Sequence, residues 1–243
     1  GPAAAPVDVL PTLWFRNTWS WDAEHAKPAL ERVDAAGGVH VRATHHRLGE
    51  RWLHVPDGAD LLFCENETNS ERLWGTPNAT AFVKDGIARA VVHGAPDAGN
   101  GERGTKVAVR FGADVPAGGE VSFVVRLDDV APSESALVGT DVVLAARQAE
   151  ADEFYASITP PSLDPEGAHV LRTALAGMLW SKQYYYFDLE RWLREHDSHP
   201  LTQSVRPGVR NTEWLHMLNS DIISMPDKWE YPWYAAWDLA FHM

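Results

Sequence analysis

The chain has 243 residues and a mass of 26.9 kDa, enough for one large domain or two small ones. It is 45% hydrophobic and 23% charged, and no apolar run approaches the roughly 20 residues that cross a bilayer, so a globular chain is predicted and a membrane-spanning one excluded. The net charge of −13 would repel a phosphate backbone, so a nucleic-acid partner is not expected. The single cysteine, Cys64, favours a reducing, cytoplasmic compartment.

Tryptophan is the unusual component of the composition, with 11 residues. Five lie between Trp14 and Trp74, none follows until Trp180, and six lie between Trp180 and Trp237. Tryptophan both fills protein cores and stacks on ligands. The two clusters therefore mark two regions of the chain whose aromatic side chains need separate explanations.

The first half of the chain has a hydrophobic period of two, which is typical of half-buried strands. The alternating runs cover residues 39–44, 106–111 and 121–127. Pro116-Ala117-Gly118-Gly119 separates the last two runs and has the length of a hairpin turn. Several short strands joined by such turns predict a β-sandwich-like domain over residues 1–131.

A helical period begins after this strand-rich part. Thr140 can cap a helix whose apolar residues recur at three and four positions. Pro160-Pro161 ends that helix, because proline removes a backbone donor and clashes with the preceding turn. Residues 132–163 are therefore predicted to form a linker with a connecting helix.

A second helix is predicted to start at Asp164-Pro165-Glu166, which supplies a capping side chain, a proline at the first helical position and an early acid. The apolar stripe that begins at Leu171 predicts that this helix continues towards Trp192. The last residues, 235–243, have the pattern of a further apolar helix at its start. The chain is therefore expected to be an internal segment of a longer protein.

The segment Met225–Asp238 combines three indoles, two phenols and three carboxylates in fourteen residues. Sugars present apolar C–H faces that stack on aromatic rings and hydroxyl groups that carboxylates accept from. This mixture predicts one wall of a sugar-binding pocket. The residues that we expect to contact the sugar on this argument are Trp229, Glu230, Trp233 and Asp238.

The alternative interpretation of this segment is a buried helix. Trp229, Trp233 and Trp237 are spaced by four and would share one helical face, but Pro232 disfavours a continuous helix through Trp229. Asp238 lies in apolar surroundings, where it could cap a helix or pair with an arginine as well as bind a sugar hydroxyl.

Four other groups of residues are candidates for chemistry. His45-His46 has no third ligand at a useful spacing, so a solvated pair is favoured over a metal site. Cys64 is predicted to be a small buried hydrophobe, and Glu65–Arg72 a solvated loop. Tyr184–Phe187 could line a pocket or simply pack. No phosphate loop, nucleophile elbow or cysteine metal motif is present in the sequence, so no cofactor and no metal is expected.

Several stretches of the sequence resemble glycoside hydrolase family 63, in its bacterial glucosidase and mannosylglycerate hydrolase-like members. These stretches are Leu175–Gln183, Asn219–Trp233 and Trp237–Phe241, and the run Leu10–Trp21 is similar to the β-rich domain that precedes the catalytic domain in the long bacterial members. The resemblance implies a β-sandwich followed by an all-α (α/α)6 toroid, with the beginning of the toroid over residues 164–243. In the Trp-Asp-x-x-Phe element it makes Asp238 a sugar ligand, and it adds Trp237 and Phe241 to the substrate-binding residues.

The resemblance also implies hydrolysis of α-linked glucosides or related oligosaccharides with inversion, which needs an acid and a base roughly 6.5–9.5 Å apart. In the family both carboxyl groups lie on later toroid segments, so no catalytic residue is expected within this chain. The expected function is therefore that of a segment that supplies part of the sugar-binding wall and is inactive by itself. Its expected partners are the carbohydrate substrate and the remainder of the toroid, and neither nucleic acid nor membrane.

Two alternatives give the strand-rich half another role. It could be a non-catalytic carbohydrate-binding module, with a platform formed by Trp14, Trp19, Trp21 and Trp74. It could instead be an interaction domain that packs on the helical part. Burial of these tryptophans between sheets and against helices would contradict the binding-module alternative.

Overall fold

A computed structural model describes residues 1–20, 24–95, 99, 102–201 and 215–225. The chain divides into an N-terminal unit, Gly1–Val143, and a C-terminal unit, Leu144–Met243. The first contains strands β1 to β9 with helices α1 and α2, and the second contains α4, α5, β10 and β11. Helix α3 begins in the first unit and continues into the second. None of the described helices is both long enough and apolar enough to cross a membrane.

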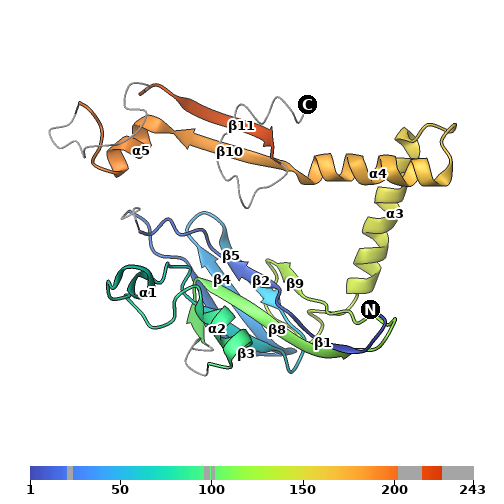
Figure 1. Cartoon of the computed structure of the whole chain (residues 1–243), viewed down its shortest axis with the longest axis horizontal. Helices are drawn as coiled ribbons and strands as arrows, with labels where there is room; N and C mark the ends of the chain where they lie inside the picture. The colour runs from blue at the N-terminus through green and yellow to red at the C-terminus, as the bar shows by residue number, and fades with distance from the viewer. Residues whose placement is uncertain (21–23, 96–98, 100–101, 202–214, 226–243) are drawn as a thin grey trace. The chain divides into compact units, whose positions relative to one another are not determined.

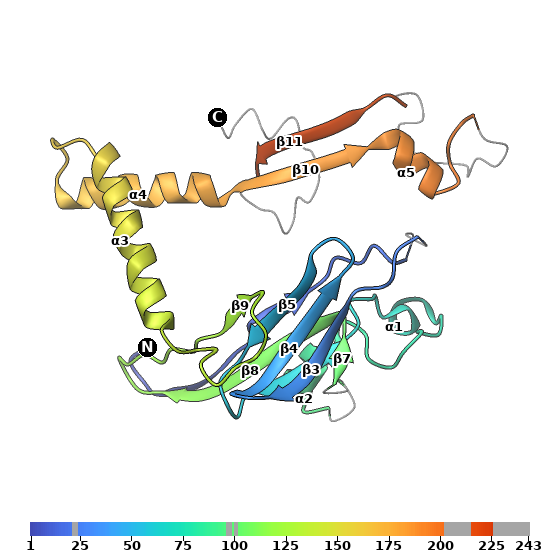
Figure 2. The same ribbon diagram turned by 180° about the vertical axis from the view of Figure 1, so that it is seen from behind.

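The N-terminal unit consists of two antiparallel sheets. One has the order β1-β8-β2, with β6 also paired to β8, and the other has the order β7-β3-β4-β5-β9. The strands of the first sheet lie in front of those of the second in Figure 1 and behind them in Figure 2. The strands are β1 Ala5–Val9, β2 Thr12–Trp14, β3 Ala29–Ala35, β4 Gly38–His45, β5 Gly49–His54, β6 Asp60–Cys64, β7 Arg103–Gly104, β8 Lys106–Val115 and β9 Arg126–Asp128.

The core of this unit is formed by apolar side chains from both sheets. Its buried members are Leu30, Val41, Ala43, Leu53, Val55, Leu61, Phe63, Val107, Val109 and Phe111. Within β8, Val107, Val109 and Phe111 lie on one face, as the period of two predicts. Two sheets that share one core make the unit sandwich-like.

The outer face of the β6–β8 sheet is covered by a helix that sequence analysis does not anticipate. Helix α2, Gly86–His93, places Ile87 against Cys64 and Ala108, which explains why β8 is buried on both faces. A short helix, α1 Ser70–Trp74, begins inside the predicted loop Glu65–Arg72, because the Asn69 side chain accepts a hydrogen bond from the backbone N–H of Arg72.

The strand predicted over residues 121–127 is shorter than expected, since only Arg126–Asp128 joins the sheet as β9. Its partner β5 ends at His54, and Pro56, which has no N–H to donate, starts the turn into β6. Residues 121–125 therefore run past the end of β5 without a ladder partner among the described strands. Phe123 still reaches the core, where its ring stacks on Phe111 with centroids 4.6 Å apart.

Two buried histidines connect three strands of the larger sheet. The Nδ1 atoms of His40 and His54 are 3.0 Å apart, and Nε2 of His54 is 3.0 Å from Oδ1 of Asp128 on β9. Nε2 of His40 is 3.1 Å from the carbonyl oxygen of Ala36, so all four ring nitrogens have partners, as buried polar atoms require. Burial opposes ionisation of Asp128, but hydrogen bonds from the Val130 amide and from His54 lower its pKa. This network attaches the short β9 to β5.

Both helices predicted after the strand-rich half are present, and the second is shorter than predicted. After α3, Thr140–Ile158, helix α4 spans Pro165–Trp180, and the Asp164 side chain accepts a hydrogen bond of 2.8 Å from the Gly167 amide. Helix α4 does not continue towards Trp192.

A two-stranded antiparallel ribbon follows α4. Strand β10, Lys182–Asp188, pairs along its whole length with β11, Leu218–Ser224, and a short helix, α5 Leu189–Glu195, lies between them in the sequence (Figure 1). The prediction of a β-sandwich followed by the beginning of an all-α (α/α)6 toroid is therefore wrong. A consecutive aromatic run, Tyr184–Phe187, prefers the pleated surface of a strand to a helix.

Candidate functional site

All six residues predicted to bind substrate, Trp229, Glu230, Trp233, Trp237, Asp238 and Phe241, lie outside the described residues. The structure does describe the β10–β11 ribbon that precedes them in the sequence, and the chain as far as Met225.

Two stretches that the sequence analysis singled out, Leu175–Gln183 and Asn219–Trp233, meet in this ribbon. The end of Leu175–Gln183 and the start of Asn219–Trp233 pair with each other, in the register Lys182 with Ser224 and Gln183 with Ile223. The pairing is extended by a hydrogen bond of 2.9 Å from the amide of Met225 to the carbonyl oxygen of Ser181. The aromatic and acidic segment thus follows directly from Met225, which is buried and hydrogen-bonded.

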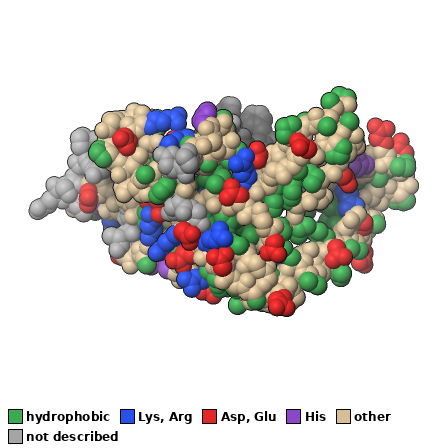
Figure 3. Space-filling view, turned by 90° about the horizontal axis from the view of Figure 1, so that it is seen from below, with side chains coloured by type: hydrophobic (Ala, Val, Ile, Leu, Met, Phe, Trp, Pro, Cys, Tyr) green, Lys and Arg blue, Asp and Glu red, His purple; other side chains and the backbone are tan. Residues whose placement is uncertain are grey.

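The tryptophans of the strand-rich half differ in their exposure. Trp52 is buried, whereas Trp14 and Trp74 are exposed, and Trp21 lies outside the described residues. Apolar side chains reach the surface in many places between acidic and basic ones (Figure 3), so exposure alone does not mark a binding site. Trp19 differs from the others because it belongs to a polar cluster.

This cluster, named here the Lys27 cluster, consists of Trp19, Lys27, Glu65 and Glu67. The Lys27 ammonium lies 2.9 Å from Oε2 of Glu65 and 2.8 Å from Oε1 of Glu67. The Trp19 indole N–H donates to the same Glu67 oxygen at 2.8 Å, and the ammonium lies 5.2 Å from the centre of the Trp19 ring. Thr105 donates to Oε2 of Glu65 at 2.7 Å. The cluster therefore combines an aromatic ring, a cation and two carboxylates.

The segment that follows β6 positions the two carboxylates of the cluster. Residues 65 and 67 follow β6 directly, on either side of a bend at Asn66, and both side chains contact the Lys27 ammonium. Between them, the Asn66 amide N–H donates to the Thr105 hydroxyl at 2.8 Å, and its side chain donates to the carbonyl oxygen of Phe15 at 2.9 Å. The segment is thereby attached to the residue that follows β2 and to the residue that precedes β8.

The charges of the cluster support each other. Burial opposes ionisation of Glu67, but hydrogen bonds from Lys27 and Trp19 lower its pKa. Burial also opposes the charge of Lys27, while its hydrogen bonds to Glu67 and Glu65 raise its pKa. Lys27 is therefore held as a cation and Glu67 as a carboxylate.

This geometry suits binding rather than acid/base catalysis. Both carboxylates contact one nitrogen, at 2.9 and 2.8 Å, so their oxygens lie closer together than the roughly 6.5–9.5 Å of an inverting pair. A glutamate whose pKa is lowered cannot serve as a general acid near neutral pH. Ionised carboxylates beside an indole can instead accept hydrogen bonds from ligand hydroxyl groups.

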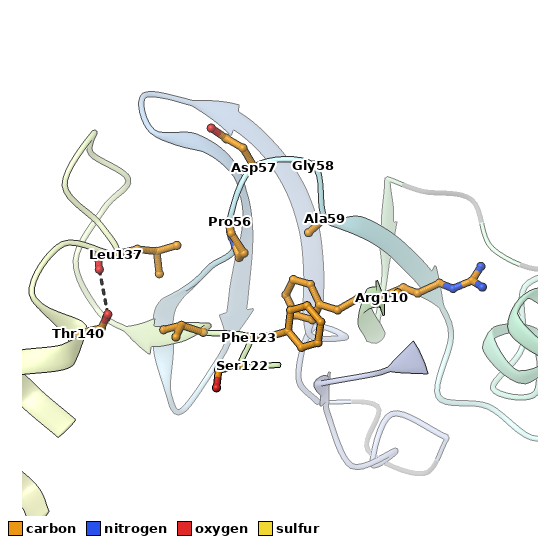
Figure 4. Close-up of a pocket in the computed structure, with 12 residues that line it drawn as sticks. Pro56, Asp57, Gly58, Ala59, Arg110, Ser122, Phe123, Leu137 and Thr140 are labelled. Carbon is orange, nitrogen blue, oxygen red and sulfur yellow. Dashed lines mark hydrogen bonds between the residues drawn. The ribbon is translucent and has the colours of Figure 1, made fainter. Parts of the chain in front are cut away.

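A cavity of about 490 Å³ lies between the turn from β5 to β6, strand β8 and the segment that precedes α3 (Figure 4). Phe123, Pro56 and Leu137 line it, and the guanidinium of Arg110 points away from it. Arg110 instead pairs with Asp8 at 2.8 Å. Asp57, Ser122 and Thr140 also line the cavity, and the Thr140 hydroxyl already donates to the carbonyl oxygen of Leu137 at 3.1 Å.

The histidine pair and Cys64, the other candidates from the sequence, contact protein side chains. The ring of His46 stacks on His45 and on His25, with centroids 4.4 and 4.1 Å apart. The described residues contain no group of three or more ligating side chains that could hold a metal ion. Cys64 is fully buried, as predicted. Sequence reasoning missed Lys27 because its partners lie about 40 positions further along the chain, although the carboxylates two residues apart after an apolar strand were visible.

No family model matches the chain. The chain is 34% identical, over 271 residues of alignment, to the uncharacterized protein YMR196W of Saccharomyces cerevisiae. The alignment includes 96% of this chain and 25% of the yeast protein, so the chain spans about a quarter of that protein's length. The name of the yeast protein states no activity, so this similarity assigns no reaction to the chain.

Proposed function

We propose that the chain is a carbohydrate-binding segment of an inverting glycoside hydrolase that acts on α-linked glucosides or related oligosaccharides. In this proposal Asp238 accepts hydrogen bonds from a sugar, Trp229, Trp233, Trp237 and Phe241 stack on it, and Glu230 adds a second acceptor. The acid and the base lie in other parts of the protein. The single cysteine fits a cytoplasmic location, and no cofactor, nucleic acid or membrane takes part.

The main support is the juxtaposition of the two family 63-like stretches in the β10–β11 ribbon. Motifs separated by 35 or more positions in the sequence meet side by side, and the aromatic and acidic segment follows at once from the buried Met225. The two stretches pair with each other directly before the segment that carries the predicted sugar ligands, which supports a shared role in binding.

The test is calorimetric titration of residues 1–243 with α-linked gluco-oligosaccharides. Asp238→Asn should weaken binding by about tenfold or more, since hydrogen bonds to a charged acceptor contribute about 1.5–3 kcal/mol. Asp164→Asn is the matched control, because Asp164 caps α4 outside the predicted sugar wall and asparagine also caps helices well. Equal affinity of Asp238→Asn and the unsubstituted chain would refute the proposal. Hydrolysis by residues 1–243 that Asp238→Asn abolishes would refute the placement of the acid and base elsewhere.

A second candidate function is a non-catalytic carbohydrate-binding sandwich. The observation that favours it is the Lys27 cluster, with an indole, an ammonium and two carboxylates on one surface of the N-terminal unit. Trp19→Ala and Glu67→Gln should then weaken oligosaccharide binding while Asp238→Asn leaves it unchanged. Phe154→Ala provides the control, because Phe154 is an exposed aromatic residue of α3 that belongs neither to the cluster nor to the predicted tryptophan platform. Binding that is insensitive to Trp19 and Glu67 would exclude this alternative.

A further inference from the structure

The β10–β11 ribbon has two faces of different character. Tyr185, Phe187 and Ile223 lie on one face, where Ile223 is buried, the two aromatic side chains are half-buried with ring centroids 6.5 Å apart, and Asp221 is exposed. Tyr184 and Tyr186 alternate with them and lie on the other face. That face remains exposed, with Tyr184 at 65% and Tyr186 at 52% of full exposure.

The ring of Tyr184 is held along the surface of this exposed face. In the ribbon register Tyr184 opposes Ile222, and Ser220 opposes Tyr186. The Tyr184 hydroxyl nevertheless shares a hydrogen bond of 2.9 Å with the Ser220 hydroxyl, which is its diagonal neighbour. A tyrosine that reaches its diagonal neighbour must lean along the ribbon rather than stand away from it. One side of the ring therefore rests on the strands and the other side faces solvent.

The remaining groups on the face are apolar or carry donors and acceptors. Ile222 and Leu218 add apolar surface beside the two tyrosines. At the end of the ribbon nearest to position 226, the Lys182 ammonium donates to the Ser224 hydroxyl. Flat rings edged by hydroxyl and ammonium groups match a sugar, whose C–H face stacks while its hydroxyl groups exchange hydrogen bonds.

We infer that the exposed face of the β10–β11 ribbon is an outer subsite that stacks one or two sugar units of an oligosaccharide. This inference rests on the proposed function, because the sugar wall predicted over residues 229–241 follows in the sequence from the Lys182–Ser224 end of the ribbon. Tyr184 supplies the stacking ring, Tyr186 a second ring on the same strand, and Ser220 fixes the first ring in place. A longer oligosaccharide that contacts both the predicted sugar wall and this face is expected to bind more tightly than a disaccharide.

The test compares disaccharides with longer α-linked gluco-oligosaccharides as ligands of residues 1–243 in calorimetry. Tyr184→Ala and Tyr186→Ala should each weaken binding of the longer ligands by roughly three- to tenfold and leave disaccharide binding unchanged. Tyr184→Phe keeps the ring and loses the bond to Ser220, so it should weaken binding less than Tyr184→Ala. Phe154→Ala, which removes an exposed aromatic side chain from α3, should have no effect.

The outcomes separate this inference from the proposed function. If Tyr184→Ala and Tyr186→Ala leave the dependence on ligand length unchanged while Asp238→Asn weakens all ligands, the outer subsite is refuted and the proposed function stands. If the unsubstituted chain binds no oligosaccharide, both fail. If the tyrosine substitutions change the sedimentation coefficient of the chain instead of its sugar affinity, the face is a protein interface and the inference is overturned. Circular dichroism of Tyr184→Phe shows whether the ribbon remains folded.

Discussion

Lys27→Met isolates the electrostatic role of the Lys27 cluster, because methionine keeps much of the apolar stem and removes the ammonium. The substitution deletes two contacts of 2.9 and 2.8 Å and leaves Glu65 and Glu67 close together without a cation. Breaking a fully buried pair costs about 3–5 kcal/mol, and an exposed pair contributes about 0–1 kcal/mol. The carboxylates are 23% and 21% exposed but Lys27 is 41% exposed, so solvent screens it substantially. We therefore expect a loss of about 1–2 kcal/mol at neutral pH.

The pH dependence tests the cause of this loss. The pKa of Glu67 is lowered in the folded chain, so its pairing contributes stability above its ordinary pKa of about 4.3, and this contribution disappears as the pH falls through the folded value. Urea denaturation followed by circular dichroism should thus show a large difference between Lys27→Met and the unsubstituted chain at neutral pH and little difference near pH 3. Lys84→Met, at an exposed position, is the control. An equal loss of stability at both pH values would refute the electrostatic reasoning.

Gly104→Ala should destabilise the N-terminal unit by about 1–3 kcal/mol in urea denaturation, because its Cβ would lie 2.3 Å from the backbone oxygen of Cys64; an unchanged midpoint would contradict this. Burial raises the pKa of the Cys64 thiol to about 11, so a thiol reagent at neutral pH should label it after denaturant is added and not before. Burial, and after it the charge of His46, lowers the pKa of His45, so the stability that His45 contributes is present above its ordinary pKa of about 6.5 and is lost in acid. His45→Asn should flatten the fall in stability between about pH 7 and pH 5, and the same change at the exposed His169 should not.

Sequence reasoning worked where one pattern decided the structure. The alternation of Val107, Val109 and Phe111 placed them on one face of β8, and the capping side chain of Asp164 placed the start of α4. It failed over Tyr184–Phe187, because aromatic residues on both faces of a ribbon leave no period of two to detect. It overextended the strand at residues 121–125, because the length of a strand also depends on its neighbour, and the neighbour ends before Pro56.

The candidate site was harder to predict than the fold. The approach of Lys27 to Glu65 and Glu67 depends on how β6 and the segment after β2 meet in the sandwich, and no local pattern encodes that meeting. The carboxylates themselves were visible as alternating residues after an apolar strand. Functional groups that are close in the sequence, such as Glu65 and Glu67, can thus be recognised from it. A partner about 40 positions away, such as Lys27, is found only in the three-dimensional structure.

Ser181 is the single residue between helix α4 and strand β10. Its amide donates to the carbonyl oxygen of Gly177, its hydroxyl donates to that of Met178, and its own carbonyl oxygen accepts from the amide of Met225. With every polar group engaged, this residue sets the phase at which the strand leaves the helix. Because side chains alternate along a strand, one residue inserted after Ser181 should reverse the orientation of β10 relative to α4. Tyr184 and Tyr186 would then lie on the face that Tyr185 and Phe187 now occupy.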